Sequence, residues 1–177
     1  MVFIGLGSNL PGPWGTPSAT IKRALLELES AGLKIVEASS IYSSCAYGKE
    51  GAPDYVNAVA RISSFLPPYA MLSRLHAIEK RAARSRGQRW GARTLDLDIL
   101  DWNGRITGAR HECGQGYAVF RPLSLPHPGI ASRPFVILPL AEIMPNWHHP
   151  VSGKTAKVLA KAVQKQKAGQ ILEKLTV

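Results

Sequence analysis

The 177-residue sequence has little cysteine, no long apolar run and few acidic residues, and each shortage excludes a class of protein. Two cysteines, Cys45 and Cys113, are too few for a disulfide framework, and no paired Cys/His spacing indicates a zinc site. The longest clean apolar run, residues 135–141, is much shorter than a membrane-spanning helix. The first residues show neither the basic segment nor the cleavage site of a secretory signal peptide, so we do not expect secretion. We therefore expect a cytoplasmic protein with no membrane partner.

The composition is that of a folded domain. Hydrophobic residues make up 45% of the chain and charged residues 19%, which is too apolar for a disordered sequence. At about 150 residues per domain, the length predicts one domain, and it is sufficient for a core that needs no disulfide or metal. We expect a monomer with a single domain over residues 1–177, ending in a lysine-rich helical extension from about residue 154.

The acidic shortage leaves a large positive charge. Lysine and arginine total 22 against 12 aspartate and glutamate, a net charge of +10 that predicts an anionic partner such as nucleic acid, nucleotide or acidic lipid. Two clusters hold much of the excess. The first is rich in arginine, whose planar fork suits phosphate, and the second contains lysines at helical spacing, which is typical of a solvated surface. The clusters are Arg81, Arg84, Arg86, Arg89 and Arg93, and Lys154, Lys157, Lys161, Lys165, Lys167 and Lys174.

Hydrophobic periodicity predicts an alternation of strands and helices. Strands are expected over residues 2–6, 33–42, 55–63 and 94–102, with helices over 18–31 and 68–83. The order β-α-β-β-α-β indicates an α+β fold of the ferredoxin-like, split βαβ type. Extra C-terminal helices are predicted over residues 134–144 and from about Lys154.

The sharpest chemical feature is the pair Asp96 and Asp98 in the last predicted strand. Side chains alternate between the faces of a strand, so these two carboxylates share one face while Leu95, Leu97 and Ile99 share the other. Because neighbouring carboxylates repel, a divalent cation is the simplest way to keep both ionised. An ordinary exposed strand face is the alternative. The upstream arginines favour the metal, since carboxylates for Mg²⁺ beside guanidiniums for phosphate are typical of phosphoryl transfer.

Other residues give weaker signals. Trp90, in the arginine-rich loop, could stack on a planar heterocycle or simply anchor the loop. His127, between two prolines, could donate to phosphate or be structural, and Asn57 could bind a heterocycle or pack in the sheet. Residues 7–9, Gly-Ser-Asn, lack the Gly-Lys-Ser/Thr of a P-loop.

Four segments in order resemble the 6-hydroxymethyl-7,8-dihydropterin pyrophosphokinase family of folate biosynthesis. They are FIGLGSNL at residues 3–10, PDYVNA at 53–58, RWGARTLDLDI at 89–99 and LPHP at 125–128. The resemblance covers residues 3 to about 150. It implies a ferredoxin-like fold, ATP as co-substrate and two Mg²⁺ ions. The implied reaction transfers diphosphate to the hydroxymethyl group of the pterin and releases AMP.

The resemblance also implies roles for individual residues. The metal ligands would be Asp96 and Asp98, which with Arg84 and Arg93 form the catalytic set. The pterin would contact Ser44, Tyr55, Asn57, Trp90 and Phe135. ATP would contact Glu79, Arg84, Arg86, Arg89, Trp90, Arg93, Ile99, Leu123, His127 and Arg133. No residue stands out as a general base, and Asp96 or activation of the hydroxyl by Mg²⁺ is the best candidate.

A non-catalytic RNA-binding module is the rival interpretation, because it shares the strand order and the high positive charge. However, residues 55–63 lack the glycine- and aromatic-rich signature that supplies stacking platforms for RNA bases. Asp96 and Asp98 would also repel a phosphate backbone. We therefore expect small-molecule substrates and no nucleic-acid partner.

Overall fold

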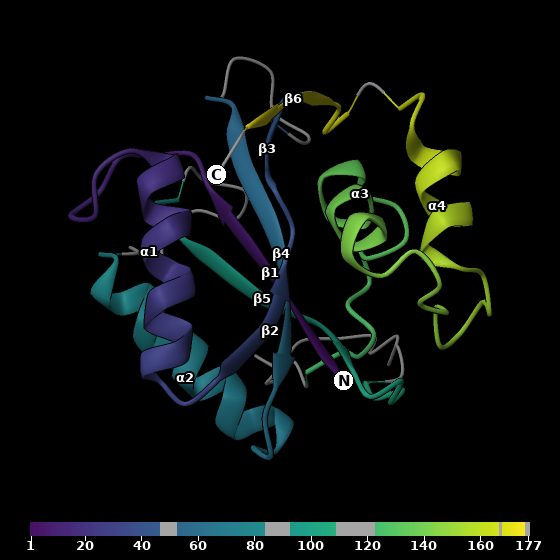
Figure 1. Ribbon diagram of the computed structural model, residues 1–177, viewed down its shortest axis with the longest axis horizontal. Helices are drawn as coiled ribbons and strands as arrows, with labels where there is room; N and C mark the ends of the chain where they lie inside the picture. Colours follow the sequence, from purple (N-terminus) through teal and green to yellow (C-terminus); the bar gives the residue numbers. More distant parts are fainter. Residues whose placement is uncertain (47–52, 84–92, 109–122, 167, 176–177) are drawn as a thin grey trace, which may run out of the picture.

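The computed structural model describes residues 1–46, 53–83, 93–108, 123–166 and 168–175 (Figure 1). An antiparallel sheet lies at the centre, with helices on both of its faces. In chain order the elements are β1 (Val2–Ser8), α1 (Pro17–Ser30), β2 (Lys34–Ala38), β3 (Ile41–Ser44), β4 (Tyr55–Ser63), α2 (Pro68–Arg81), β5 (Asp96–Trp102), α3 (Pro134–Ile143), α4 (Ala156–Val163) and β6 (Ile171–Leu175).

The sheet has the strand order β5-β1-β4-β3-β6, and β2 also pairs with β4. The central strand β1 is antiparallel to both of its neighbours. Its Gly7 lies opposite Asn57 of β4 on one side and opposite Asp96 of β5 on the other. Three residues from distant parts of the sequence are thus neighbours across three strands.

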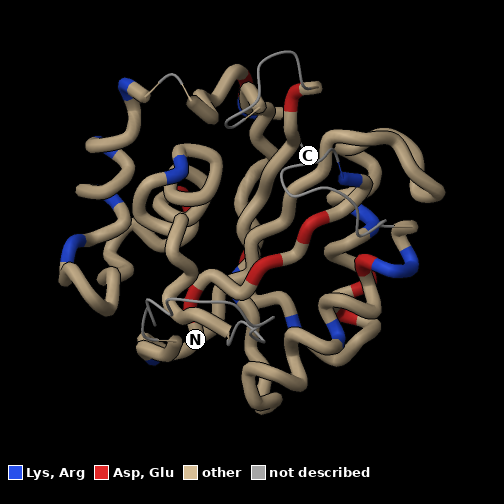
Figure 2. Tube along the Cα trace, turned by 180° about the vertical axis from the view of Figure 1, so that it is seen from behind, with Lys and Arg blue, Asp and Glu red and all other residues tan. Residues whose placement is uncertain are grey.

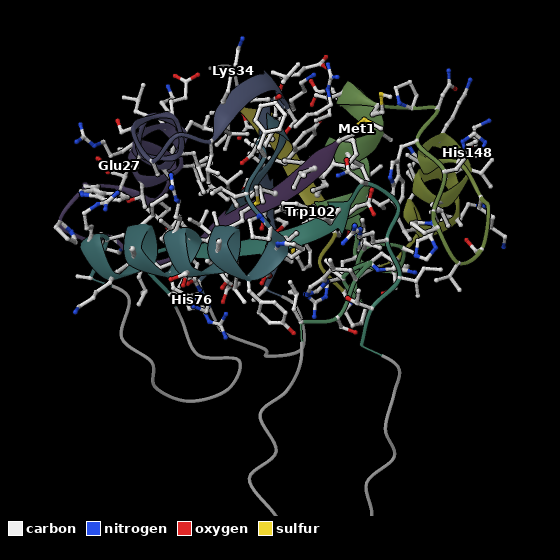
Figure 3. All side chains as sticks on the ribbon, turned by 90° about the horizontal axis from the view of Figure 1, so that it is seen from below. Met1, Glu27, Lys34, His76, Trp102 and His148 are labelled. Carbon is white, nitrogen blue, oxygen red and sulfur yellow. The ribbon has the colours of Figure 1, made fainter. Side chains whose placement is uncertain are left out.

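Two apolar cores lie on opposite faces of the sheet. On one face α1 and α2 cover side chains such as Ile4, Leu6 and Leu97, which are almost fully buried. On the other face α3 and α4 pack on Phe3 and Leu100. Figure 3, viewed from below, shows α1 and α2 on one side of the sheet and α4 on the other. The second pair of helices covers less of its face, which leaves room for a site.

Local signals explain the helix boundaries well. Thr16 caps α1 by accepting a hydrogen bond from the Ala19 N–H (3.3 Å), and Pro17 begins the helix. The chain leaves the helix through Gly32, whose φ of +76° favours glycine. The predicted helices over residues 18–31, 68–83 and 134–144 are therefore confirmed to within two residues at each end.

The predicted single strand over residues 33–42 is wrong in one respect, because it is interrupted between β2 and β3. Ser39 accounts for the break: its Oγ accepts a hydrogen bond from the Val59 N–H (3.0 Å), in addition to the backbone bond from the Ser39 N–H to the Val59 carbonyl (2.9 Å). Ala38 pairs with Ala60 and Tyr42 with Asn57, so the chain carries one extra residue at this point.

The C-terminal region differs more from the prediction. Lysines at helical spacing predicted a helix from about Lys154, and α4 does form, with Lys157 and Lys161 exposed. Figure 2 marks the lysine positions along it in blue. The helix ends at Val163, however, and a strand that was not predicted, β6, follows and pairs with β3. A strand of only five residues at the edge of a sheet carries too short a pattern to be predicted from its sequence alone. None of the helices in the described ranges combines the length and apolar character needed to cross a bilayer.

Candidate active site

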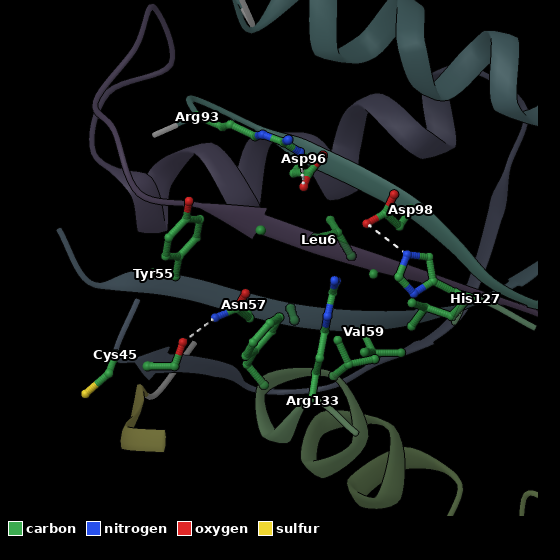
Figure 4. Close-up of a pocket in the computed structure, with 17 residues that line it drawn as sticks. Leu6, Cys45, Tyr55, Asn57, Val59, Arg93, Asp96, Asp98, His127 and Arg133 are labelled. Carbon is green, nitrogen blue, oxygen red and sulfur yellow. Dashed lines mark hydrogen bonds and ion pairs between the residues drawn. The ribbon is translucent and has the colours of Figure 1, made fainter. Parts of the chain in front are cut away.

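A pocket of about 340 Å³ lies on the part of the sheet that α3 and α4 leave uncovered (Figure 4). Side chains from β3, β4 and β5, the glycines of β1, the start of α3 and the segment before it line this pocket. The principal lining residues are Gly5, Gly7, Ser44, Cys45, Tyr55, Asn57, Arg93, Asp96, Asp98, His127, Arg133 and Phe135.

The floor of the pocket consists of two glycines of β1, Gly5 and Gly7, which point to this face of the sheet. A Cβ atom at Gly7 would lie 3.4 Å from Asn57 Oδ1 and 3.9 Å from Asp96 Cβ. At Gly5 it would lie 3.2 Å from Leu100 Cδ2. The absence of side chains here keeps the space between β4 and β5 open. This role was not predicted from the sequence, although alternate glycines inside a strand are the signal that indicates it.

Asp96 and Asp98 both face the pocket, as the alternation of the strand predicted, while Leu97 and Ile99 are buried on the other face. Arg93 Nη1 donates to Asp96 Oδ2 at 2.6 Å, and the two side chains are 29% and 26% exposed. The Asp98 side chain is 46% exposed. One carboxylate is therefore paired with a cation, and the other is the more accessible to a ligand.

His127 lies at the Asp98 end of the pocket and is held by the backbone on both sides. The backbone N–H of His127 donates to the Leu100 carbonyl of β5 (2.8 Å), and its ring Nδ1 accepts from the Gly129 backbone N–H (3.1 Å). Nε2 is 3.9 Å from Asp98 Oδ2. Burial lowers the pKa of His127, an effect that Asp98 opposes and Arg133 reinforces. At neutral pH the ring is thus neutral, with its proton on Nε2, which faces Asp98.

The opposite end of the pocket is less charged. Asn57 is only 5% exposed, and its Nδ2 donates to Ser44 Oγ of β3 at 2.9 Å. Tyr55 lies beside them, and burial raises the pKa of its phenol, an effect that Arg93 opposes and Asp96 reinforces. Phe135, at the start of α3, lines the pocket and provides an aromatic wall. An amide, two hydroxyl groups and an aromatic ring suit a flat heterocycle with hydrogen-bonding edges.

Asn9 has a positioning role that the sequence did not suggest. Its N–H donates to the Arg93 carbonyl (3.0 Å) and its Oδ1 accepts from the Arg93 N–H (2.7 Å). Its Nδ2 donates to the Pro53 carbonyl (3.3 Å), and the neighbouring Ser8 Oγ donates to the Thr94 carbonyl (2.6 Å). Ser8, at the end of β1, and Asn9, which follows it, therefore hold the backbone of Arg93 and Thr94, and Asn9 also contacts the segment leading to Tyr55.

Comparison with known proteins identifies the family. The family model described as "7,8-dihydro-6-hydroxymethylpterin-pyrophosphokinase (HPPK)" matches residues 3–145. The chain belongs to the HPPK family. It is 39% identical over 154 residues to a 2-amino-4-hydroxy-6-hydroxymethyldihydropteridine pyrophosphokinase of Synechocystis, covering 86% of this chain and 70% of the relative. It is 41% identical over 141 residues to the enzyme of the same name from Haemophilus influenzae, covering 80% and 79%.

Solved structures of the HPPK family share the fold. The HPPK-DHPS of Plasmodium falciparum matches 93% of this chain with a TM-score of 0.66 and 14% sequence identity. The chain spans 45% of that protein's length, so it corresponds to one part of a longer chain there. The family resemblance predicted from the sequence is confirmed. None of these comparisons supports the RNA-binding alternative.

Not every residue that the HPPK resemblance pointed to lies at the pocket. Glu79 is buried in α2, where its Oε1 accepts from the Leu97 N–H (2.8 Å). Ile99 and Leu123 pack with the core on the α1 and α2 side of the sheet. Four further residues fall outside the described ranges, namely Arg84, Arg86, Arg89 and Trp90. Contacts of all these residues with nucleotide remain predictions.

Asp96 and Asp98 can bind Mg²⁺ when phosphate oxygens of a substrate and water supply the remaining ligands. No cluster of three or more His, Cys, Asp or Glu side chains in the described part of the chain could hold a metal ion by itself. Asp96 and Asp98 offer two carboxylates on one face of β5. Mg²⁺ is commonly held by one or two carboxylates, with phosphate oxygens and water completing its coordination. These residues therefore fit the metal that an HPPK would use with ATP.

Proposed function

We propose that the pocket over β1, β4 and β5 is where this chain carries out the HPPK reaction. The chain transfers diphosphate from ATP to the hydroxymethyl group of 6-hydroxymethyl-7,8-dihydropterin, which releases AMP, in folate biosynthesis. One observation carries the assignment of the site: Gly7 lies between Asn57 and Asp96 in the sheet register. Asn57, which can hydrogen-bond a heterocycle, and Asp96, which can bind a metal ion, thus lie on either side of Gly7. A reaction between a pterin and a polyphosphate requires both groups close together.

The pterin occupies the end of the pocket formed by Ser44, Tyr55, Asn57 and Phe135 in this proposal. Asn57 is buried, and its Oδ1 faces the glycine floor while Nδ2 bonds Ser44. An amide offers both an acceptor and donors, which match the alternating edge of a pterin ring. Phe135 stacks on the ring. This arrangement leaves the hydroxymethyl arm directed toward β5.

The polyphosphate occupies the other end, beside Arg93, Asp96, Asp98, His127 and Arg133. Guanidiniums suit phosphate oxygens, and His127 presents a protonated Nε2 as a hydrogen-bond donor. Two Mg²⁺ ions held by Asp96 and Asp98 would neutralise charge on the phosphate oxygens. The arginines at 84, 86 and 89, with Trp90, complete this end in the proposal.

The chemical step is a displacement at the β-phosphorus of ATP. The pterin hydroxymethyl oxygen attacks that phosphorus in line, the bond to the α,β-bridging oxygen breaks, AMP leaves and the hydroxyl proton is lost. Asp96, which accepts a hydrogen bond from Arg93 Nη1 (2.6 Å), is the candidate acceptor for that proton. The chain contributes mainly by holding the two reactants in line and by placing positive charge around the phosphates.

The fold supports this function as a ferredoxin-like domain with additions. Taking β2 and β3 as one interrupted strand, the order β5-β1-β4-β2/β3 is that of the split βαβ arrangement, with β6 added at the edge. We propose that residues 1–177 form a single cytoplasmic domain that acts as a monomer.

The direct test is AMP release. Purified chain with ATP and Mg²⁺ should release AMP only when 6-hydroxymethyl-7,8-dihydropterin is present, and chelation of Mg²⁺ should stop the release. AMP release that is independent of pterin would contradict the assignment. An RNA-binding module would instead show RNA affinity that falls steeply with salt and needs no Mg²⁺.

A further inference from the structure

Glu142, in the last turn of α3, joins three separate elements outside the pocket. Its carboxylate accepts hydrogen bonds from the Ser40 N–H (3.1 Å), the Ser40 hydroxyl (2.8 Å) and the Tyr42 hydroxyl (2.9 Å). Lys174 of β6 donates to the same carboxylate at 2.8 Å. The side chain of Glu142 is 26% exposed and that of Lys174 is 56% exposed, so solvent screens the ion pair with Lys174. One carboxylate thus binds the end of α3 to both β3 and β6.

Each of these elements is connected to the pterin end of the pocket. The first turn of α3 carries Phe135, and β3 ends at Ser44, which bonds Asn57. β6 supports β3 from the outer edge of the sheet, where Ser44 pairs with Ile171 and the Cys45 N–H donates to the Gln170 carbonyl (3.0 Å). Figure 1 shows β6 alongside β3. Phe135 and Ser44, on two sides of the pterin end of the pocket, are therefore linked outside the pocket through α3, β3 and β6.

The electrostatics favour an ionised carboxylate at this junction. Burial raises the pKa of Glu142, but hydrogen bonds from Lys174, Ser40 and Tyr42 outweigh burial and leave the pKa below its ordinary value. Burial and the neighbouring Glu142 raise the pKa of Tyr42, so its phenol remains a donor at neutral pH. Hydrogen bonds to a charged acceptor are stronger than neutral ones, so this junction resists separation of α3 from β3.

We propose that Glu142 is a positioning residue that sets the width of the pterin end of the pocket, and that β6 acts with it through Lys174. This proposal rests on the proposed function, because it assigns the wall between Phe135 and Ser44 to the pterin. The family match ends at residue 145, so β6 adds support that lies beyond the matched region. Neither Glu142 nor Lys174 lines the pocket itself.

The test compares variants of Glu142 and Lys174 with a matched carboxylate on the opposite side of the sheet. Glu27 of α1 pairs with Arg23 and Arg81, each at 2.7 Å, and its side chain is 13% exposed. Glu27→Ala removes comparable charged contacts without touching the pterin walls. Glu142→Ala removes all four hydrogen bonds, Glu142→Gln keeps an acceptor for Ser40 and Tyr42, and Lys174→Ala removes only the link to β6.

The measurements are calorimetric affinities for 6-hydroxymethylpterin, in the presence of an ATP analogue, and for the analogue alone, with a melting curve for each variant. Glu142→Ala should weaken pterin binding roughly tenfold, which corresponds to about 1.4 kcal/mol. Lys174→Ala should weaken it roughly threefold, and Glu142→Gln, which keeps one acceptor oxygen but loses the charged bond from Lys174, should weaken it by a similar factor. Affinity for the analogue should change less than about twofold in every variant. Glu27→Ala should lower the melting temperature but leave pterin affinity unchanged.

Two results would overturn the proposal. One is unchanged pterin affinity in folded Glu142→Ala and Lys174→Ala proteins. The other is a parallel loss of pterin and nucleotide affinity that follows the melting temperature, as for a purely structural residue. If Glu142→Ala fails to fold, Lys174→Ala and Glu142→Gln decide the matter alone. Failure of the unmodified chain to bind pterin or release AMP would instead contradict the proposed function.

Discussion

The two faces of the sheet differ in what their side chains are used for. On the face toward α1 and α2, Ile4, Leu6 and Leu97 are closed from solvent in one continuous core. On the other face, the same strands present Gly5, Gly7 and then charged residues, and the helices α3 and α4 cover only part of the surface. A single strand can therefore stabilise the protein with one set of alternate residues and build the site with the other. Mutations on the two faces should separate stability from catalysis.

The largest effect is expected from the carboxylates. Asp96→Ala and Asp98→Ala should each lower turnover at least ~10²-fold in a folded protein, because each removes a metal ligand and its charge. Leu97→Ala, between them but on the closed face, should instead lose about 2–5 kcal/mol of folding stability. Turnover at limiting Mg²⁺ and melting curves measure the two outcomes. Normal turnover of either aspartate variant would remove the metal assignment.

A change at Asn57 tests the pterin end of the open face. Asn57→Ala leaves polar groups of the ring unpaired, at a cost of about 1–3 kcal/mol each. Pterin affinity should then fall roughly 5- to 150-fold, at about 1.4 kcal/mol per factor of ten. Nucleotide affinity should hardly change, because in the proposed arrangement the nucleotide lies on the other side of Asp96 and Asp98 from Asn57. If Asn57 only packs the sheet, calorimetry will show both ligands weakening together as the melting temperature falls.

The glycine floor gives a sharper test within one strand. A Cβ at Gly7 makes only ordinary contacts, so Gly7→Ala should fold normally but place a methyl group between Asn57 and Asp96. We expect pterin affinity to fall roughly tenfold, or about 1.4 kcal/mol. At Gly5 the new methyl group meets Leu100 at 3.2 Å, so Gly5→Ala should change stability more than Gly7→Ala does. Equal pterin affinity in Gly7→Ala and the unmodified chain would show that the ligand does not lie on this floor.

The smallest expected effect is a pH dependence of folding stability, to which one carboxylate on each face of the sheet contributes. Glu27 and Glu142 both have pKa values below the ordinary 4.5, so each contributes stability that is fully present above that value. This stability is lost as the pH falls through the lower pKa of the folded state. For Glu142, the difference in melting temperature between the unmodified chain and Glu142→Gln should be about 2–4 °C at neutral pH. The difference should shrink toward zero in acid; a constant difference would contradict the lowered pKa.

The sequence alone determined the features that depend on neighbours along the chain. Helix boundaries followed from Pro17, Gly32 and the apolar spacing, and strand alternation placed Asp96 and Asp98 on one face. Four short motifs were enough to predict the family, which the match over residues 3–145 confirms. These features rest on steric and periodic rules that act over a few residues.

Tertiary structure decided everything that depends on pairing between distant segments. Only the register of three strands revealed that Gly7 lies between Asn57 and Asp96. Only the fold showed that Asn9 holds the backbone of Arg93, and that β6 joins the edge of β3. Strand preference depends on the tertiary context, so the five residues of β6 complete the sheet because the edge of β3 is available to them. The side chains around the pocket were therefore predictable in kind, and their arrangement came from the fold.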